Sequence, residues 1–364
     1  MLNDFRKGMG NVELGERKQR ILAAVVELFI RTGEPVGSKT LVGVLENTVS
    51  SATIRNDMAE LAAMDYLEQP HTSAGRVPTP AAFRLYIDKL MCRHSLSQDD
   101  RNRIDAMLLQ AAGDPERLIS EASEALAETT GYAAVTTAPS GRSVKVKRIE
   151  VLRVSPCSAA IILMTDSGVL RSRICRFDVD QIDASLLQRI SRALNDCFCG
   201  HALGNIGLPQ VQSMAASMGE HSLLCAPAVT AFFQLVQDTS EVEISLNGHL
   251  NILRHPDYDN IHARDLLAFL TKRELLTGML TSMPTGLRVV IGSESKRPEL
   301  DGSSIIATHY KLGGRPDGSI GIIGPLRMDY ARAIPKIEYF ARTISKILDE
   351  IIGVGEQTDI NDSI

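Results

Sequence analysis

The chain has 364 residues, of which 44% are hydrophobic and 23% are charged, and its formal net charge is −5. This length exceeds what one core normally needs, so we expect two or three domains, and no stretch approaches the roughly 20 consecutive apolar residues of a membrane-spanning helix. The first ten residues contain no apolar run typical of a secretory signal, and the six scattered cysteines are typical of reduced thiols. We therefore expect a cytoplasmic protein with no membrane partner.

The acidic net charge is unevenly distributed. Residues 1–93 carry 12 Lys and Arg against 11 Asp and Glu, a net of +1, whereas residues 94–364 carry 27 against 33, a net of −6. The charge of the whole chain therefore does not exclude nucleic-acid binding by the N-terminal segment, which depends on where its basic side chains point.

The apolar spacing at the N-terminus predicts three successive helices. The first covers Glu16–Arg31 and ends at Gly33, because Gly and Pro in residues 33–37 favour a turn. Ser38 is the expected cap of a short second helix. Its expected inward residues are Leu41, Val44 and Leu45. After a tight connection, Ser50 or Ser51 begins a third helix that runs to about Met64.

A hairpin and a fourth helix follow. Residues Tyr66–Pro78 contain two short extended pieces around 71–75, and Thr79 caps the next helix with Pro80 at its first position. Helix, short helix, tight turn, helix and hairpin is the order of a winged helix-turn-helix. The N-terminal segment is thus predicted to bind double-stranded DNA.

The third helix offers a candidate surface for reading bases. If Ile54, Met58 and Leu61 face the core, a rotation of 100° per residue points a different set of side chains away from it. That set is Ala52, Asn56, Ala59 and Ala63, with Thr53 and Arg55 on the flanks. Asn56 can pair with adenine through two hydrogen bonds, and Arg55 can reach guanine or a phosphate.

Other residues are candidates for contacts to the DNA backbone. Ser50, Ser51 and Thr53 lie at the start of the third helix, where free N–H groups and hydroxyls favour a phosphate. Lys39 and Thr40 begin the second helix, and the predicted wing contains His71, Thr72, Ser73 and Arg76. The alternative for each group is an ordinary solvated helix face or surface turn.

The rest of the chain alternates between helical and β-rich segments. Residues Cys92–Asp100 look like a linker, and two helices follow within 99–130. Three β-rich runs within 144–177 predict an antiparallel meander. The further expected elements are a helix over 184–198, a helix over 261–280, strands at 286–292, 303–311 and 319–324, and a long helix over 328–352. Residues 353–364 are polar and are expected to be a disordered tail.

Several motifs together resemble the HrcA family of heat-inducible transcription repressors. In the N-terminal segment they are G-E-P-V-G-S-K-T-L (33–41), S-S-A-T-I-R-N-D-M-A-E-L (50–61), Y-L-E-Q-P-H-T-S-A-G-R-V-P-T (66–79) and Y-I-D-K-L-M (86–91). Further along they are N-I-L (251–253), P-D-Y (256–258), V-V-I-G-S-E (289–294), S-I-I-A-T-H-Y (304–310) and G-S-I-G-I-I-G-P-L-R-M-D-Y (318–330). The resemblance covers nearly the whole chain.

The resemblance implies an α+β multidomain protein with a winged helix at 1–92. It also implies a GAF-like α/β domain at 100–203 and 284–352, with a dimerisation domain at 204–283 inserted into it. Ser51, Thr53, Arg55 and Asn56 would then read bases, and residues 71–76 would form the wing. The implied function is repression of chaperone operons by a homodimer bound to an inverted-repeat operator. The GroE chaperonin would assist folding of the repressor, so that heat stress releases it from DNA.

Three other interpretations are weaker. A GAF-like domain could sense a ligand while the winged helix binds protein or less specific DNA, but no binding fingerprint is present, and residues 313–318 lack the spacing of a phosphate loop. Cys197, Cys199 and His201 are too few for a closed zinc site, which usually needs four ligands. No catalytic motif occurs. We therefore expect no cofactor, no metal and no enzymatic activity.

Overall fold

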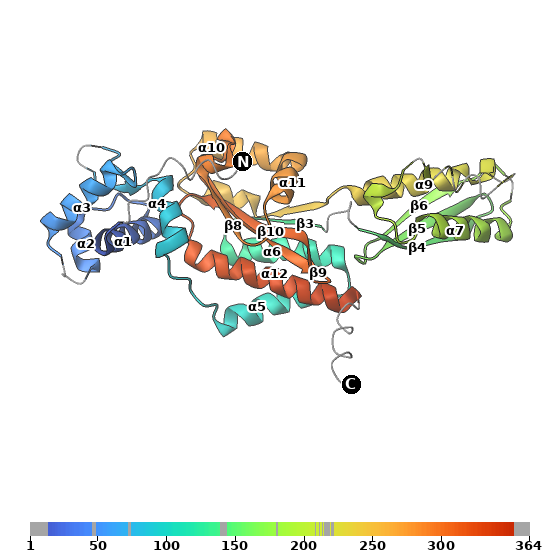
Figure 1. Ribbon diagram of the computed structural model, residues 1–364, viewed down its shortest axis with the longest axis horizontal. Coiled ribbons are helices and arrows are strands. Elements are labelled where there is room, and N and C mark those ends of the chain that lie inside the picture. Colours follow the sequence, from blue (N-terminus) through green and yellow to red (C-terminus); the bar gives the residue numbers. More distant parts are fainter. Residues whose placement is uncertain are drawn as a thin grey trace.

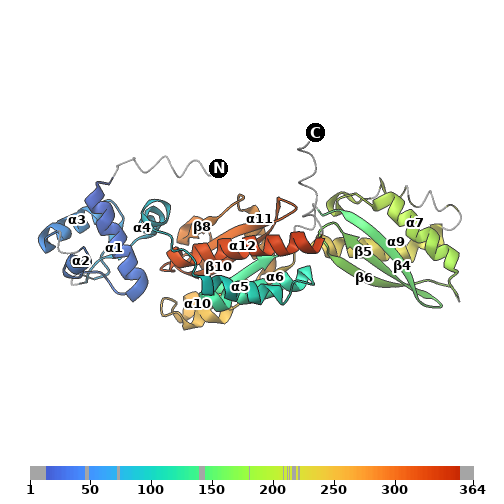
Figure 2. The same cartoon turned by 90° about the horizontal axis from the view of Figure 1, so that it is seen from below.

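A computed structural model describes residues 14–45, 49–71, 74–138, 144–179, 181–207 and 222–352, together with positions 209, 210, 212, 214 and 219. The described residues form a mixed α and β structure whose three parts lie in a row (Figure 1). The view from below shows the same order (Figure 2). An N-terminal part lies at one end, a five-stranded sheet with its helices occupies the middle, and a three-stranded sheet lies at the other end.

The N-terminal part consists of α1 (Glu16–Thr32), α2 (Ser38–Val44), α3 (Ser51–Ala63), and the antiparallel pair β1 (Leu67–Glu68) and β2 (Val77–Pro78). The first helix ends at Gly33, where φ is +72° and the N–H donates to the carbonyl of Phe29 at 2.8 Å. The inner faces of the three helices share one apolar core that includes Ile21, Leu22, Val25, Leu41, Ile54 and Leu61. The predicted order of these elements is confirmed.

One of the three residues of the second helix that we expected to face the core faces solvent instead. Val44, expected to face inward, is 46% exposed, whereas Leu41 and Leu45 are buried. Three residues correspond to 300° of rotation, so Val44 lies about 60° from Leu41 on the side away from Leu45. A two-turn helix has room for only a narrow buried stripe.

The fourth predicted helix is divided in two. The α-helix α4 (Pro80–Leu85) continues into a π-helical turn, η2 (Tyr86–Leu90), and residues 91–97 have no regular structure. Thr79 caps α4 by accepting a hydrogen bond from the N–H of Ala82 and also donates to the carbonyl of Asp65 at 2.7 Å. The helix therefore starts at a residue fixed against the end of α3.

The central part is built on an antiparallel sheet with the order β7-β3-β10-β9-β8. Its strands are β3 (Ala133–Thr137), β7 (Ile244–Asn247), β8 (Arg288–Ile291), β9 (Ser303–Leu312) and β10 (Arg315–Pro325). The helices α5 (Gln98–Leu109), α6 (Pro115–Thr130) and α12 (Tyr330–Ile352) lie on one side, and α10 (Asn260–Thr271) and α11 (Arg273–Ser282) lie on the other (Figure 1).

Alternate residues of the strands supply the two sides of this sheet. Ala134, Ile306 and Ile322 belong to the core shared with α6 and α12, while their neighbours Ala133, Ile305 and Ile323 belong to the core shared with α10 and α11. All six side chains are at least 97% buried. Because both faces are covered, these strands read as nearly continuous apolar runs.

The third part is a meander of β4 (Val146–Ser155), β5 (Ser158–Thr165) and β6 (Leu170–Arg176), as predicted, with α7 (Ala184–Phe198) and α9 (Ser222–Ser240). A separate apolar core joins one face of the meander to the two helices, including Ile149, Ile161, Leu163, Ile190, Leu194 and Phe232. The opposite face carries exposed apolar residues, among them Leu152, Leu170 and Ile174.

These cores divide the chain differently from the boundaries that we expected. Residues 144–203 were expected to join 284–352, but β4, β5, β6 and α7 share their core with α9 instead. Within the expected insert 204–283, α10 and α11 pack on the five-stranded sheet. The third part is thus an insertion between β3 and β7, at about 144–240. Apolar periodicity identified buried faces but could not show which of two sheets each face covers.

Among the described residues, two strands and one α-helix were absent from the prediction. The strand β3 is short and buried on both sides, so it lacks the alternation that marks a half-exposed strand. The helix α9 contains Pro227, which argues against a helix, and β7 has only four residues. The expected helix over 261–280 is broken at Lys272 into α10 and α11.

No helix within the described ranges is both long and apolar enough to span a bilayer. The expected tail at 353–364 lies outside the described residues.

Candidate nucleic-acid interface

The start of α3 is organised by three hydroxyl groups. Ser50 caps the helix, with its Oγ accepting a hydrogen bond from the N–H of Thr53 at 3.2 Å and lying 2.9 Å from the hydroxyl of the same residue. The Oγ of Ser51 is 3.1 Å from the Oγ of Ser38 at the start of α2. Two helix N-termini are thereby joined, and Ser50 remains exposed beside them.

The outward face of α3 matches the rotation argument. Ile54, Met58 and Leu61 are at least 96% buried, and the exposed residues of the helix are Ala52, Arg55, Asn56, Ala59, Glu60 and Ala63. Thr53, on the flank, is half-buried. Ala52, Ala59 and Ala63 keep the surface low on one side of Asn56. The other side carries Glu60, one turn further along, whose carboxylate is paired with Lys18 of α1. In Figure 1 the helix lies at the outer end of the N-terminal part, away from the central sheet.

A buried carboxylate on the inner face of α3 was missed. Asp57 is 2% exposed and accepts hydrogen bonds from Nε and Nη2 of Arg17 at 2.7 and 3.0 Å. The hydrogen bonds to this carboxylate raise the pKa of Arg17. Lys18 of the same helix also pairs with a carboxylate of α3, that of Glu60 at 2.5 Å. Asp57 follows Ile54 by three residues, and this spacing was the available signal of its burial.

The base of the predicted wing is fixed to the connection between α1 and α2. Arg76 and Val36 exchange two backbone hydrogen bonds, each 2.9 Å long. A Cβ at Gly75 would lie 2.4 Å from the carbonyl oxygen of Val36, so this close approach requires glycine. His71 is exposed at the hairpin and Arg76 is half-buried, while Thr72 and Ser73 lie outside the described residues.

The basic side chains of the N-terminal part differ in whether a carboxylate engages them. Arg17 and Lys18 of α1 are paired with α3. Lys39 and Thr40 are exposed on the first turn of α2. None of the ion pairs found among the described residues involves Lys39, Arg55 or Arg76. These three cations are therefore available for phosphate or base contacts.

In the third part, Cys197 and Cys199 lie at the C-terminal end of α7. The Sγ of Cys199 is 3.0 Å from Oδ1 of Asn195, and burial raises the pKa of both Cys197 and Cys199. Both side chains are half-buried, and all six cysteines are free thiols. The part of the chain that the structure describes contains no group of three or more His, Cys, Asp or Glu side chains arranged to hold a metal ion.

Comparison with known proteins identifies close relatives over nearly the whole length. The family model described as the HrcA protein C terminal domain matches residues 116–334. The heat-inducible transcription repressor HrcA of Pelotomaculum thermopropionicum is 32% identical over 348 residues, covering 94% of this chain and 99% of the relative. That of Desulforamulus reducens is 33% identical over 344 residues, with coverage of 94% and 99%. The HrcA repressor of Geobacter sulfurreducens is 33% identical over 340 residues, with coverage of 93% and 99%.

A solved structure supports the fold. The crystal structure of a hypothetical protein, 24% identical in sequence, aligns with a TM-score of 0.64 and covers 93% of this chain and 100% of its own. At this identity the likeness concerns the arrangement of the elements alone.

Proposed function

The chain belongs to the HrcA family of heat-inducible transcription repressors, and on this premise we propose that it represses chaperone operons by binding an inverted-repeat operator as a homodimer. The exposed face of α3 is the observation that carries this proposal. It presents the Asn56 amide, the Arg55 guanidinium and small alanines, beside a Glu60 carboxylate that Lys18 neutralises, on the outer helix of the proposed winged helix-turn-helix. In that arrangement this helix enters a major groove.

Individual roles follow from chemistry and position. Asn56 and Arg55 make the base contacts, with the amide suited to adenine and the guanidinium to guanine. Ser51 and Thr53 contribute at the start of the same helix. Ser50, Lys39, Thr40 and the wing residues His71, Thr72, Ser73 and Arg76 contact the backbone or the minor groove. Their contacts set the position of α3 along the groove.

An inverted repeat requires a two-fold symmetric protein, and the third part offers a surface for pairing. The face of its sheet opposite α7 and α9 places Leu152, Ala160 and Ile174 in one row across the three strands, with Met164 beside Leu170 four residues further along. Leu152 is 52% exposed, Leu170 54% and Ile174 65%. We assign this face, within the inserted unit 144–240, to contact with a second copy of the chain, because apolar surface of this kind marks an interface.

The central part serves as a scaffold of the GAF-like type. Both faces of its five-stranded sheet are covered by packed apolar side chains from α6 and α12 on one side and α10 and α11 on the other. This packing favours a scaffold over the alternative, a ligand-sensing regulator.

The response to heat depends on the folding of the repressor. Assistance by the GroE chaperonin keeps part of the population in the DNA-binding form. Heat diverts the chaperonin to other unfolded proteins, the active fraction falls, and the chaperone operons are transcribed.

Fluorescence anisotropy tests the proposal. The purified chain is titrated onto a labelled inverted-repeat duplex from upstream of a chaperone operon and onto a scrambled duplex, at several salt concentrations. Tight binding to the repeat alone, with a salt slope of several phosphate contacts, supports it. Equal binding to both duplexes, unchanged when chaperonin and ATP are added, contradicts it.

A further inference from the structure

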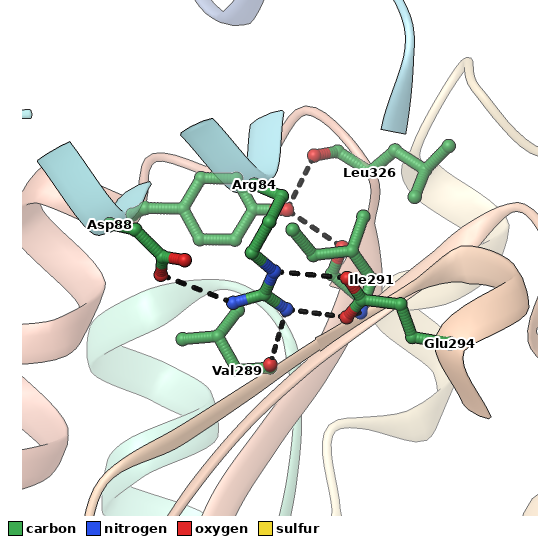
Figure 3. Close-up of polar contacts among 8 residues, drawn as sticks. Arg84, Asp88, Val289, Ile291, Glu294 and Leu326 are labelled. Carbon is green, nitrogen blue, oxygen red and sulfur yellow. Dashed lines mark hydrogen bonds and ion pairs between the residues drawn. The ribbon is translucent and has the colours of Figure 1, made fainter. Parts of the chain in front are cut away.

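Two arginine side chains bind the N-terminal part, together with the α4 that follows it, to the central part, and the first is Arg84 of α4. Its Nε donates to Oε1 of Glu294 at 2.9 Å, and its Nη2 donates to Oε2 of the same carboxylate and to the carbonyl of Val289 at 2.6 Å. Figure 3 shows the guanidinium between Glu294, Val289 and Asp88. Such a two-pronged bond fixes orientation as well as distance.

The acceptor side of this bond is held in place by its own backbone. Oε2 of Glu294 also accepts the N–H of Ile291 at 3.0 Å, and the turn between them passes through Gly292 with φ +50°. A Cβ at Gly292 would lie 2.8 Å from the carbonyl oxygen of Asp301. The motif V-V-I-G-S-E (289–294) therefore forms a rigid receptor for a guanidinium, a role that DNA reading does not explain.

Arg327, just before α12, makes the second attachment. Here the arginine belongs to the central part and the acceptor to the N-terminal part. Its Nη1 donates to the carbonyl of Ile30 in the last turn of α1 at 3.2 Å, and its Nε is paired with Asp257. The last carbonyls of a helix lack partners within the helix and attract a cation. Gly33, which ends α1, packs against the same guanidinium, since a Cβ there would lie 3.1 Å from Cζ.

Aromatic rings connect the two parts as well. Phe83 of α4 and Tyr330 of α12 are at least 99% buried, with ring centroids 6.1 Å apart, and Phe29 of α1 lies 6.4 Å from Phe83. The hydroxyl of Tyr330 is bound in turn by Ser304 and the carbonyl of Leu326. Two polar attachments with packed rings beside them restrain rotation of the N-terminal part.

We propose that Arg84 and Glu294 are positioning residues, which hold α3 at one orientation on the central part so that the two copies of α3 in a dimer meet two half-sites at one spacing. This inference rests on the proposed function. A single half-site requires only a folded N-terminal part, whereas simultaneous binding of two requires both reading helices at a fixed separation. Loss of the bond therefore weakens binding to the repeat and leaves binding to one half-site unchanged.

The test uses the full-length chain with Glu294→Gln, which keeps the side-chain volume and removes the charge, and Arg84→Gln as a second, independent variant. Glu128→Gln is the control, because it breaks the Arg103–Glu128 ion pair within the central part. Three duplexes are compared by anisotropy: an inverted repeat selected by the wild-type chain from random sequence, one half-site, and the repeat lengthened by about 5 bp, half a helical turn.

Both junction variants are expected to lose about tenfold or more in affinity for the repeat and less than about twofold for the half-site. They are also expected to lose the wild-type preference for the original spacing, while Glu128→Gln matches wild type throughout. Unchanged affinity for the repeat, or an equal loss on repeat and half-site, would overturn the inference. If the wild-type chain selects no repeat at all, it is the proposed function that fails.

Discussion

Arg17 on α1 and Asp57 on α3 form a two-pronged ion pair across 40 residues of sequence, with the carboxylate 2% exposed and the guanidinium side chain 57% exposed. The pair joins the first helix to the helix that carries the proposed reading face. A buried carboxylate is unfavourable without its cation, so the position of α3 depends on a residue that does not face the proposed DNA surface.

Arg17→Met is expected to lower the thermal stability of the chain, because it leaves the Asp57 carboxylate buried without a partner. Circular dichroism during heating measures the effect. Arg20→Met, at an exposed position of the same helix, is the control and should leave the melting temperature nearly unchanged. Equal melting temperatures for both variants and wild type would show that the pair is not structural.

Asn56→Ala and Arg55→Ala are each expected to weaken operator binding by about 1–3 kcal/mol, since each removes a proposed contact to a base edge. Both side chains are exposed, so folding and dimerisation should be retained. Arg103→Ala, at an exposed position on α5, controls for the loss of one positive charge. Operator affinity equal to wild type in both α3 variants would remove these residues from the reading surface.

Gly75→Ala is expected to destabilise the N-terminal part by about 1–3 kcal/mol, because the new methyl group has no space beside the backbone of Val36. Gly43→Ala is a matched control within α2, where a Cβ meets nothing within 4 Å and alanine should stabilise the helix by about 0.5–1 kcal/mol. Chemical denaturation measures both. A Gly75→Ala variant as stable as wild type would contradict the close approach at the wing.

Ile174→Asp is expected to convert a dimer into monomers, because it places a charge on the proposed apolar interface of the third part. Light scattering coupled to size-exclusion chromatography reports the mass. Leu109→Asp, on the exposed side of α5, introduces the same charge at another exposed leucine and should leave the mass unchanged. A dimer that survives Ile174→Asp would place the interface elsewhere.

Local elements of the N-terminal part could be predicted because their signals lie within a few residues of each other. The buried stripe of Ile54, Met58 and Leu61 and the cap at Ser50 fix which side of α3 faces outward. The partner of Asp57 could not be predicted, since Arg17 is 40 residues away and several basic residues were available. The same holds for Arg84 and Glu294, which are 210 residues apart.

The division into domains was the least predictable feature. The strands β4–β6 and β8–β10 have similar apolar character, and only their pairing shows that they belong to different sheets. Strand β3 belongs to the central sheet and precedes the inserted third part, so it marks where the insertion begins. It is too short and too uniformly buried to be recognised from an alternation of apolar and polar residues.

Operator binding by a symmetric dimer is tested by a footprint of the purified chain on DNA from upstream of a chaperone operon, at single-nucleotide resolution and with chaperonin and ATP present. We expect protection of two half-sites related by a two-fold axis, lost in both halves with Asn56→Ala. Protection that lacks this symmetry, or that persists unchanged in the variant, would contradict this proposal.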